Sequence, residues 1–122
     1  MTLSYDIRDS ATYPSGVAVI HFNERDLNRS LEDDFRNTVA VLSLKNTNRI
    51  VLDVSGAESI DSYFFSLLVQ IHRELKPGQG RIAVTGVGGH LKQVFRTVRL
   101  DEVFTIHDTL LDAIEEVERS DD

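Results

Sequence analysis

An acid and a hydroxyl stand side by side at the start of an apolar stretch, in the segment IDSYFFSLL at residues 60–68. Asp61 and Ser62 precede a run whose apolar residues recur at helical spacing, which predicts a helix beginning at Ser62. The serine hydroxyl has two uses there. It can cap the helix, or it can accept a phosphoryl group where free backbone amides and the helix dipole favour an anion.

The other reactive side chains form no complete catalytic or metal-binding set. The four histidines fall in separate predicted elements without metal-ligand spacing; they are His21, His72, His90 and His107. No G-x-S-x-G pattern surrounds Ser62, and Val87-Gly88-Gly89 completes neither a dinucleotide-binding motif nor a P-loop. We therefore expect no catalytic activity, no cofactor and no metal.

A receiver domain is an alternative class for this protein. Asp53 lies near a predicted strand end, as Thr85 does on the next strand, and this placement is faintly similar to that of a receiver domain. The acidic pair after the first strand and the lysine after the last one are missing, however. A structural role for Asp53, accepting hydrogen bonds from loop amides, is equally open.

Composition narrows the class of protein. The chain has 122 residues, of which 41% are hydrophobic and 27% charged, it carries a net charge of −7, and it contains no cysteine. This balance is typical of one globular domain. The negative charge disfavours binding to nucleic acid or anionic lipid. No apolar run is long enough to span a bilayer and no signal pattern opens the chain, so we expect a cytoplasmic protein without membrane insertion.

Strand and helix patterns alternate along the chain and define the elements that must position Ser62. Strands are predicted at Ser4–Asp9, Val17–Phe22, Arg49–Val54, Arg81–Thr85 and Val103–Ile106. Helices are predicted from the apolar spacing of Leu27, Leu31, Phe35, Thr38, Val39 and Leu42, then at Ser62–Leu75, at His90–Arg99 and at Leu110–Val117.

This order, β-β-α-β-α-β-α-β-α, predicts a single α/β domain over residues 1–119, with a mixed, mostly parallel sheet packed against about four helices. Residues 120–122 are expected to form a frayed tail. On the helix beginning at Ser62, Phe64 falls on the apolar stripe and is expected in the core. Tyr63 falls off the stripe and is expected to be exposed.

The segment RIVLDVSGAESIDSYFFSLLVQIHRELKPGQGRIAVTGV resembles the centre of a STAS domain, the fold of anti-sigma factor antagonists. That family's pattern is an apolar strand ending in aspartate, a short loop, an apolar residue, an Asp-Ser pair and an apolar helix. Asp53, Ile60, Asp61 and Ser62 fill these positions. The stretch LKQVFRTVRLDEVFTI resembles the family's third helix and last strand, and Asn23–Asp26 loosely resembles the segment before its first helix.

The resemblance implies regulation by partner switching. An unphosphorylated antagonist binds an anti-sigma factor, often a serine protein kinase; phosphorylation releases it, and a phosphatase resets it. Carried over to this chain, Ser62 is the expected phosphoacceptor. The expected partner-binding residues are Asp26, Asp61, Ser62, Tyr63 and Ser66.

The sequence departs from the family pattern directly after the Asp-Ser pair. The family usually has a small hydroxyl residue and then glycine, whereas this chain has Tyr63 and Phe64. Two aromatic rings would reshape the surface at the helix start. This departure favours an alternative function: a constitutive STAS adaptor in a transporter or stressosome-type complex, without phosphorylation.

Overall fold

The computed structural model describes residues 3–119, except for the side chain of residue 101. The frayed tail expected at residues 120–122 lies outside the described part of the chain. The strands are β1 (Leu3–Arg8), β2 (Val17–Phe22), β3 (Asp26–Leu27), β4 (Arg49–Asp53), β5 (Ser59–Ile60), β6 (Arg81–Thr85) and β7 (Thr105–His107). The α-helices are α1 (Glu32–Leu44), α2 (Ser62–Leu75), α3 (Gly89–Thr97) and α4 (Leu110–Glu118), and short 3₁₀ helices lie at Arg29–Leu31, Lys76–Gly78 and Leu100–Glu102.

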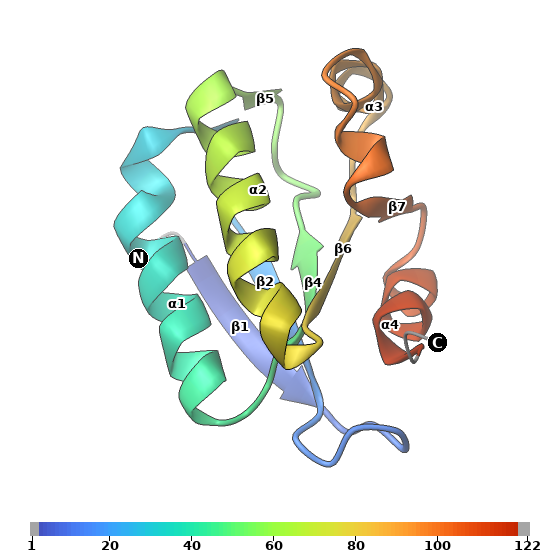
Figure 1. Cartoon of the computed structure of the whole chain (residues 1–122). Coiled ribbons are helices and arrows are strands. Elements are labelled where there is room, and N and C mark those ends of the chain that lie inside the picture. Colours follow the sequence, from blue (N-terminus) through green and yellow to red (C-terminus); the bar gives the residue numbers. More distant parts are fainter. Residues whose placement is uncertain (1–2, 120–122) are drawn as a thin grey trace.

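A five-stranded sheet forms the centre of the molecule, with the strand order β1-β2-β4-β6-β7 (Figure 1). The strand β1 runs antiparallel to β2, and the pairs β2–β4, β4–β6 and β6–β7 are parallel. Because parallel strands need crossover connections, helices lie between them in the chain. The predicted mixed, mostly parallel sheet is therefore confirmed.

The central strands are apolar on both faces, since successive side chains of a strand point in opposite directions. One face of the sheet joins the core of α1, α2 and α3 through residues such as Ile20, Leu52 and Val84. The other face carries a smaller core against α4; its fully buried members are Val17, Val19, Val51, Ala83, Ala113 and Val117. Helices thus cover both faces of the sheet.

Three phenylalanine rings join α1 and α2 to the sheet. The ring of Phe22 lies edge-on to Phe35 and Phe64, at centroid distances of 5.2 and 5.6 Å, and Phe35 stacks on Phe64 at 6.0 Å. Edge-to-face and offset pairs are the favourable geometries for aromatic rings. Phe64 is 1% exposed, which confirms that it belongs to the core.

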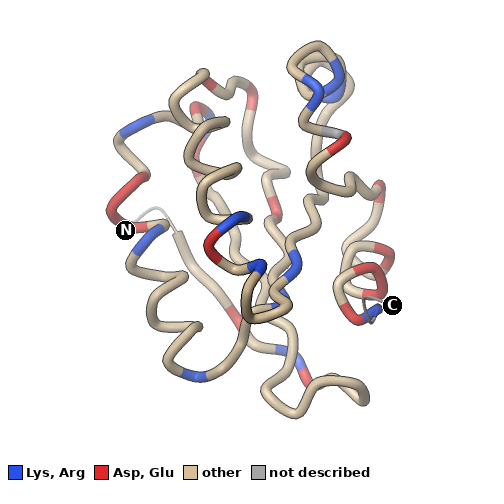
Figure 2. The backbone as a smooth tube through the Cα atoms, in the orientation of Figure 1, with Lys and Arg blue, Asp and Glu red and all other residues tan. Residues whose placement is uncertain are grey.

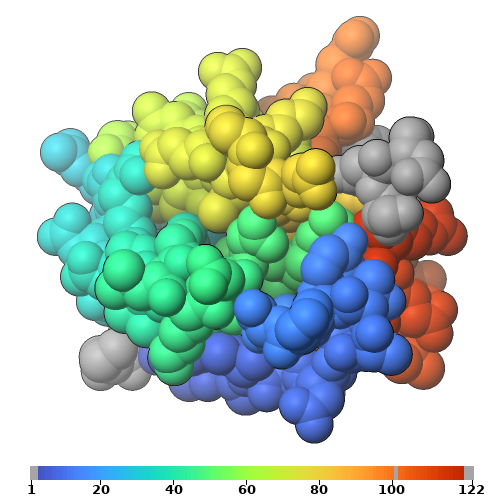
Figure 3. Space-filling model, turned by 60° about the horizontal axis from the view of Figure 1, so that its bottom comes forward, coloured from blue at the N-terminus to red at the C-terminus, as the bar shows by residue number. Residues whose placement is uncertain are grey.

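Charged side chains lie outside this core. Acidic residues occupy the first turn of α1, at Glu32, Asp33 and Asp34, where the helix dipole favours negative charge. Figure 2 shows further acidic positions along α4 and basic positions on α3. The end of the molecule seen in Figure 3 brings residues 9–16 beside the C-terminal end of α1, and there the Thr47 hydroxyl donates a hydrogen bond to the Ser15 carbonyl at 2.9 Å.

Several predicted bounds shift by one or two residues, and two of the differences have a structural reason. Leu27 does not belong to the first helix: it lies in β3, and the chain then makes a 3₁₀ turn that Asn28 caps by accepting from the Ser30 amide at 3.0 Å. The last strand is β7 at Thr105–His107 rather than Val103–Ile106. A short 3₁₀ turn precedes the regular element in both places: Arg29–Leu31 before α1, and Leu100–Glu102 shortly before β7.

Candidate functional site

The start of α2 is capped by Asp61. The Asp61 backbone is extended, and its Oδ1 accepts a hydrogen bond from the Phe64 amide at 2.8 Å. This is the geometry of a helix N-cap. Ser62 is therefore the first residue of the helix, and the interpretation of Ser62 as the cap is wrong.

Ser62 and Ser66 are exposed and lie one helical turn apart, on the same side of α2. The amides of Ser62 and Tyr63 belong to the first turn, whose N–H groups have no acceptor inside the helix. The positive end of the helix dipole points the same way. The Ser62 hydroxyl thus lies at the solvent-facing start of α2, in a place where a negative group can be accommodated.

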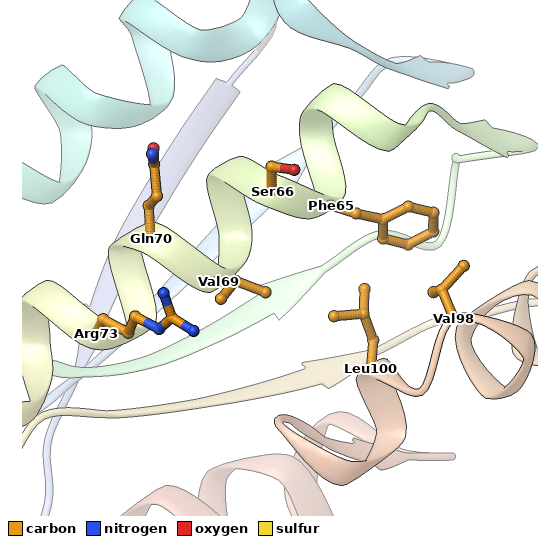
Figure 4. A pocket seen from close by; sticks show the side chains of 7 residues that line it. All are labelled: Phe65, Ser66, Val69, Gln70, Arg73, Val98 and Leu100. Carbon is orange, nitrogen blue, oxygen red and sulfur yellow. The ribbon is translucent and has the colours of Figure 1, made fainter.

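A groove of about 410 Å³ begins one turn along α2 from Ser62 and is bounded on the other side by residues that follow α3. Its lining residues are Phe65, Ser66, Val69, Gln70, Arg73, Val98 and Leu100 (Figure 4). In Figure 4, Phe65, Val98 and Leu100 point toward one another from the two sides of the groove. The Phe65 ring also meets the buried Phe95 ring edge-on, at 5.6 Å.

A two-stranded parallel sheet holds the segment before α2 against the segment before α1. Its strands are β3 and β5, in which Asp26 pairs with Ser59 and Leu27 with Ile60. The Asp61 amide donates to the Leu27 carbonyl at 3.0 Å. The Ser59 hydroxyl donates to Asp26 Oδ1 at 2.5 Å. The structure therefore brings Asp26 beside the segment that carries Asp61.

Tyr63 turns toward α1. Its hydroxyl donates a hydrogen bond to Glu32 Oε1 at 2.6 Å, and the Arg29 guanidinium lies 5.2 Å from the centre of its ring. The hydrogen bond raises the pKa of Tyr63 and lowers the pKa of Glu32. The side chain stays 40% exposed, as predicted, but it is held by these two partners.

The contacts of Tyr63 were not predicted, because Tyr63 and Glu32 are 31 residues apart and nothing in their local patterns links them. Ser62 and Ser66 face the groove side of α2, whereas Tyr63 and Asp26 lie toward the segment that precedes α1. The residues expected to bind a partner thus divide between two sides of the helix start.

A second cluster at the end of the central strands was also missed. His21 lies between two carboxylates: its Nδ1 is 2.9 Å from Asp53 Oδ2 and its Nε2 is 3.0 Å from Asp6 Oδ2. Asp53 Oδ1 also accepts a hydrogen bond from the Ser55 amide at 3.1 Å, which confirms the structural role considered for this aspartate. The parallel register pairs His21 with Asp53, and both residues are next to last in their predicted strands, so the sequence held a usable signal.

The charges of this cluster are coupled. Burial of the imidazole opposes its protonation, but hydrogen bonds to Asp6 and Asp53 outweigh that effect and raise the pKa of His21. Burial likewise opposes ionisation of Asp53, yet hydrogen bonds from Ser55 and His21 lower its pKa. The cluster is therefore an aspartate–histidine–aspartate bridge that joins β1, β2 and β4.

Within the described residues, no group of three or more histidine, aspartate or glutamate side chains is arranged so that it could hold a metal ion. In the same part of the chain, no helix has the length and hydrophobicity needed to cross a bilayer.

Known proteins are similar to this chain over most of its length. The family model of the STAS domain matches residues 10–113. A protein of Thermotoga maritima described as a candidate anti-sigma factor antagonist is 33% identical over 75 residues, which cover 62% of this chain and 66% of that protein. The chain thus spans just under two thirds of this curated relative.

Solved structures agree in fold. The crystal structure of a candidate anti-sigma factor antagonist from Thermotoga maritima has a TM-score of 0.73 and 27% identity, over 96% of this chain and 95% of that one. The unphosphorylated form of the anti-sigma factor antagonist SpoIIAA has a TM-score of 0.70 over 93% of this chain and 96% of that chain. At 17% identity, this second likeness shows the fold alone.

Proposed function

The chain belongs to the STAS domain family, and from that premise we propose that it is a regulatory binding protein, similar to anti-sigma factor antagonists. It binds an anti-sigma factor through the start of α2 when Ser62 is unmodified. A serine protein kinase, which can be the anti-sigma factor itself, phosphorylates Ser62 and releases the complex. A phosphatase restores the binding form. The chain acts by binding and contributes no catalysis of its own.

The exposure of Ser62 in the first turn of α2 carries this proposal. A kinase needs to reach the hydroxyl, and the product needs to leave the fold intact. Asp61, not Ser62, caps the helix, so a phosphate on Ser62 removes no capping bond. First-turn amides and the helix dipole also favour an added anion.

Release follows from charge. A phosphate adds about −1.5 to −2 charges at neutral pH, next to Asp61 and on the same end of the molecule as Asp26. A partner surface that accepts the neutral serine then faces repulsion and a desolvation penalty. Each loss of about 1.4 kcal/mol weakens binding tenfold, so a few disrupted contacts suffice for a switch.

Phosphate mapping tests the acceptor. The protein is incubated with serine kinases from its host, and the modified residue is located by mass spectrometry. We expect modification at Ser62 and its loss in Ser62→Ala. Ser59→Ala and Ser66→Ala are matched controls, because both serines are exposed and lie close to Ser62 along the chain. Full modification of Ser62→Ala would rule the assignment out.

Partner affinity tests the switch. A partner recovered from the host is titrated with the unmodified protein and with Ser62→Asp, and dissociation constants are measured by calorimetry. We expect Ser62→Asp to bind at least about tenfold more weakly, which corresponds to about 1.4 kcal/mol, with an unchanged circular dichroism spectrum. Ser66→Asp is the comparison variant, because it adds the same charge one helical turn away from Ser62. Equal affinity of Ser62→Asp and the parent protein would contradict the switch.

The contacts of Tyr63 favour one second candidate, a constitutive adaptor in a transporter or stressosome-type complex. Tyr63 stands where the family usually has a small hydroxyl residue, and Glu32 and Arg29 hold its ring near the phosphoacceptor position. A fixed ring there can hinder a kinase that docks on the helix start. Tyr63→Ala separates the two functions, because it removes the ring without adding a second hydroxyl beside Ser62. Faster phosphorylation of Ser62 in Tyr63→Ala than in the parent supports the adaptor, whereas an unchanged or slower rate supports the switch.

A further inference from the structure

The strand β1 forms one edge of the main sheet. Among the described residues its only strand neighbour is β2, to which it pairs along its whole length from Leu3 to Arg8 (Figure 1). Alternate backbone N–H and C=O groups of such a strand point away from the sheet without a ladder partner. β1 contains no proline, so its backbone is able to accept a further strand.

Large apolar side chains are exposed beside this edge. Of the eight large hydrophobic residues that are exposed in the described part of the chain, four lie on β1 or the C-terminal half of α1. These four are Tyr5 (38% exposed), Ile7 (39%), Val41 (40%) and Leu44 (86%). We call this surface the β1–α1 edge.

Geometry joins the four side chains into one surface. Tyr5 and Ile7 point to the same face of the sheet as the core residue Leu3. The Lys45 ammonium lies 5.7 Å from the centre of the Tyr5 ring, which places the end of α1 alongside β1. Val41 precedes Lys45 by one turn and lies on the same side of the helix.

We propose that the β1–α1 edge binds a second copy of this chain, with the two β1 strands paired antiparallel about a twofold axis. The charges of β1 favour this occupant. Asp6 and Arg8 lie on the opposite face from Ile7, where they pair with each other at 2.9 Å. When Ile7 lies opposite Ile7 of the second copy, Asp6 of each copy faces Arg8 of the other. The strand is thus complementary in charge to itself.

This pairing also covers the apolar side chains. A twofold axis perpendicular to the sheet keeps the α1 helices of both copies on the same face of one continuous sheet. Val41 and Leu44 of each copy then approach the equivalent side chains of the other across the junction. Such an interface is isologous and closes on two copies, so it forms a dimer rather than a filament.

A disulfide tests this pairing directly, because the chain has no cysteine. Directly opposed residues of antiparallel strands have Cα atoms about 4.5–5.5 Å apart, within the range that a disulfide spans. Under mild oxidation with oxidised glutathione, we expect two copies of the Ile7→Cys variant to form a disulfide with each other while they are paired in the reversible dimer. Leu111→Cys is the control, since Leu111 is 64% exposed but lies on α4. Equal crosslinking of the two variants would overturn the proposal.

Sedimentation equilibrium gives the second test. We expect the unmodified protein to dimerise reversibly as its concentration rises, and Ile7→Lys and Arg8→Asp each to raise the dimer dissociation constant by about tenfold or more. Ile7→Lys places a charge on the edge strand, which opposes pairing, and Arg8→Asp sets two aspartates opposite each other. Leu111→Lys is the control and should leave the constant unchanged. The proposal would be refuted if the protein stayed monomeric at every concentration, or if neither Ile7→Lys nor Arg8→Asp changed the dimer dissociation constant. Since Ser62 takes no part, the result is independent of phosphorylation.

Discussion

Asp61 and Ser62 are adjacent, but they have different positions in the helix start. The carboxylate of Asp61 accepts the Phe64 amide, whereas Ser62 occupies the first helical position and is exposed. The aspartate therefore stabilises the helix start, whereas the exposed serine makes no capping bond. Sequence patterns predicted the helix start to the residue, but they considered only Ser62 as a cap, although aspartate suits the N-cap position equally well.

Substitution separates these two positions. We expect Asp61→Ala to lower the free energy of unfolding by about 1 kcal/mol, the usual loss for a helix cap. Ser62→Ala removes no capping bond and should change it by less than about 0.5 kcal/mol, as exposed substitutions generally do. Urea denaturation of both variants measures the difference. A larger loss in Ser62→Ala would mean that the serine hydroxyl caps the helix in solution.

His21 makes the stability of the fold depend on pH. The two aspartates raise its pKa in the folded state above the usual value of 6.5. Below pH 6.5 the imidazole is protonated in both states, and its stabilising contribution is complete. As the pH rises further, the unfolded chain releases this proton first, so the free energy of unfolding falls until the folded pKa is passed.

His21→Asn removes this titration. We expect the stability advantage of the parent protein over His21→Asn to be larger at pH 6 than at pH 9, because the parent loses the contribution of the protonated bridge over that interval. Urea denaturation at both pH values gives the two differences, and an NMR titration of the ring gives the pKa. A constant advantage, or one that grows toward pH 9, would contradict the bridge.

At the scale of elements, α4 is joined to the sheet by a buried arginine. Arg49, in β4, is 3% exposed, and its guanidinium donates to the carbonyls of Val117 and Arg119 at 3.1 and 2.8 Å. These carbonyls lie at the C-terminal end of α4, where the helix leaves acceptors unpaired and favours a cation. The same guanidinium lies 4.2 Å from the centre of the Tyr13 ring.

Arg49→Met keeps much of the volume but removes both hydrogen bonds. We expect a loss of about 2 kcal/mol in unfolding free energy, since two carbonyls lose a charged donor. Arg96→Met, on the exposed side of α3, should stay within about 0.5 kcal/mol of the parent. Thermal and urea unfolding provide the values. Equal effects of the two variants would show that Arg49 does not hold α4.

At this scale, local sequence patterns predicted some strands and missed others. Short, nearly continuous apolar runs predicted β2 and β6 with their observed bounds, because burial on both faces leaves a strong local signal. β3 and β5 have two residues each and pair across the chain. Neither strand is long enough to show a period, so their pairing was absent from the prediction. The contact of Tyr63 with Glu32 escaped because the two residues are 31 positions apart and no local pattern links them.

At the scale of the whole molecule, the two cores differ in size. The core shared with α1, α2 and α3 contains the large aromatic and aliphatic residues, whereas the core under α4 consists of alanine and valine side chains with Leu110 and Ile114 at its margin. Hydrophobic stabilisation grows with the apolar area that is buried. The helix α4 is therefore the element that should open at the lowest free energy.

Native-state hydrogen exchange tests this order. We expect the amides of β2 and β4 to exchange only through global unfolding, and those of α4 to exchange through a local opening of lower free energy. Mass spectrometry or NMR at increasing denaturant concentration distinguishes the two routes. If the α4 amides were as protected as those of β4, the smaller core would be no weaker than the larger one.

The loop at residues 9–16 lies at the pole opposite the start of α2 (Figure 1). Thr12 is exposed there, and a tight turn closes the loop where the Gly16 amide binds the Tyr13 carbonyl at 2.8 Å. Thr12→Cys would give the chain a single thiol for a fluorescent dye. The tumbling of that dye would then report complex formation at Ser62 from a distance, so a screen for partners or inhibitors needs no probe on the recognition surface itself.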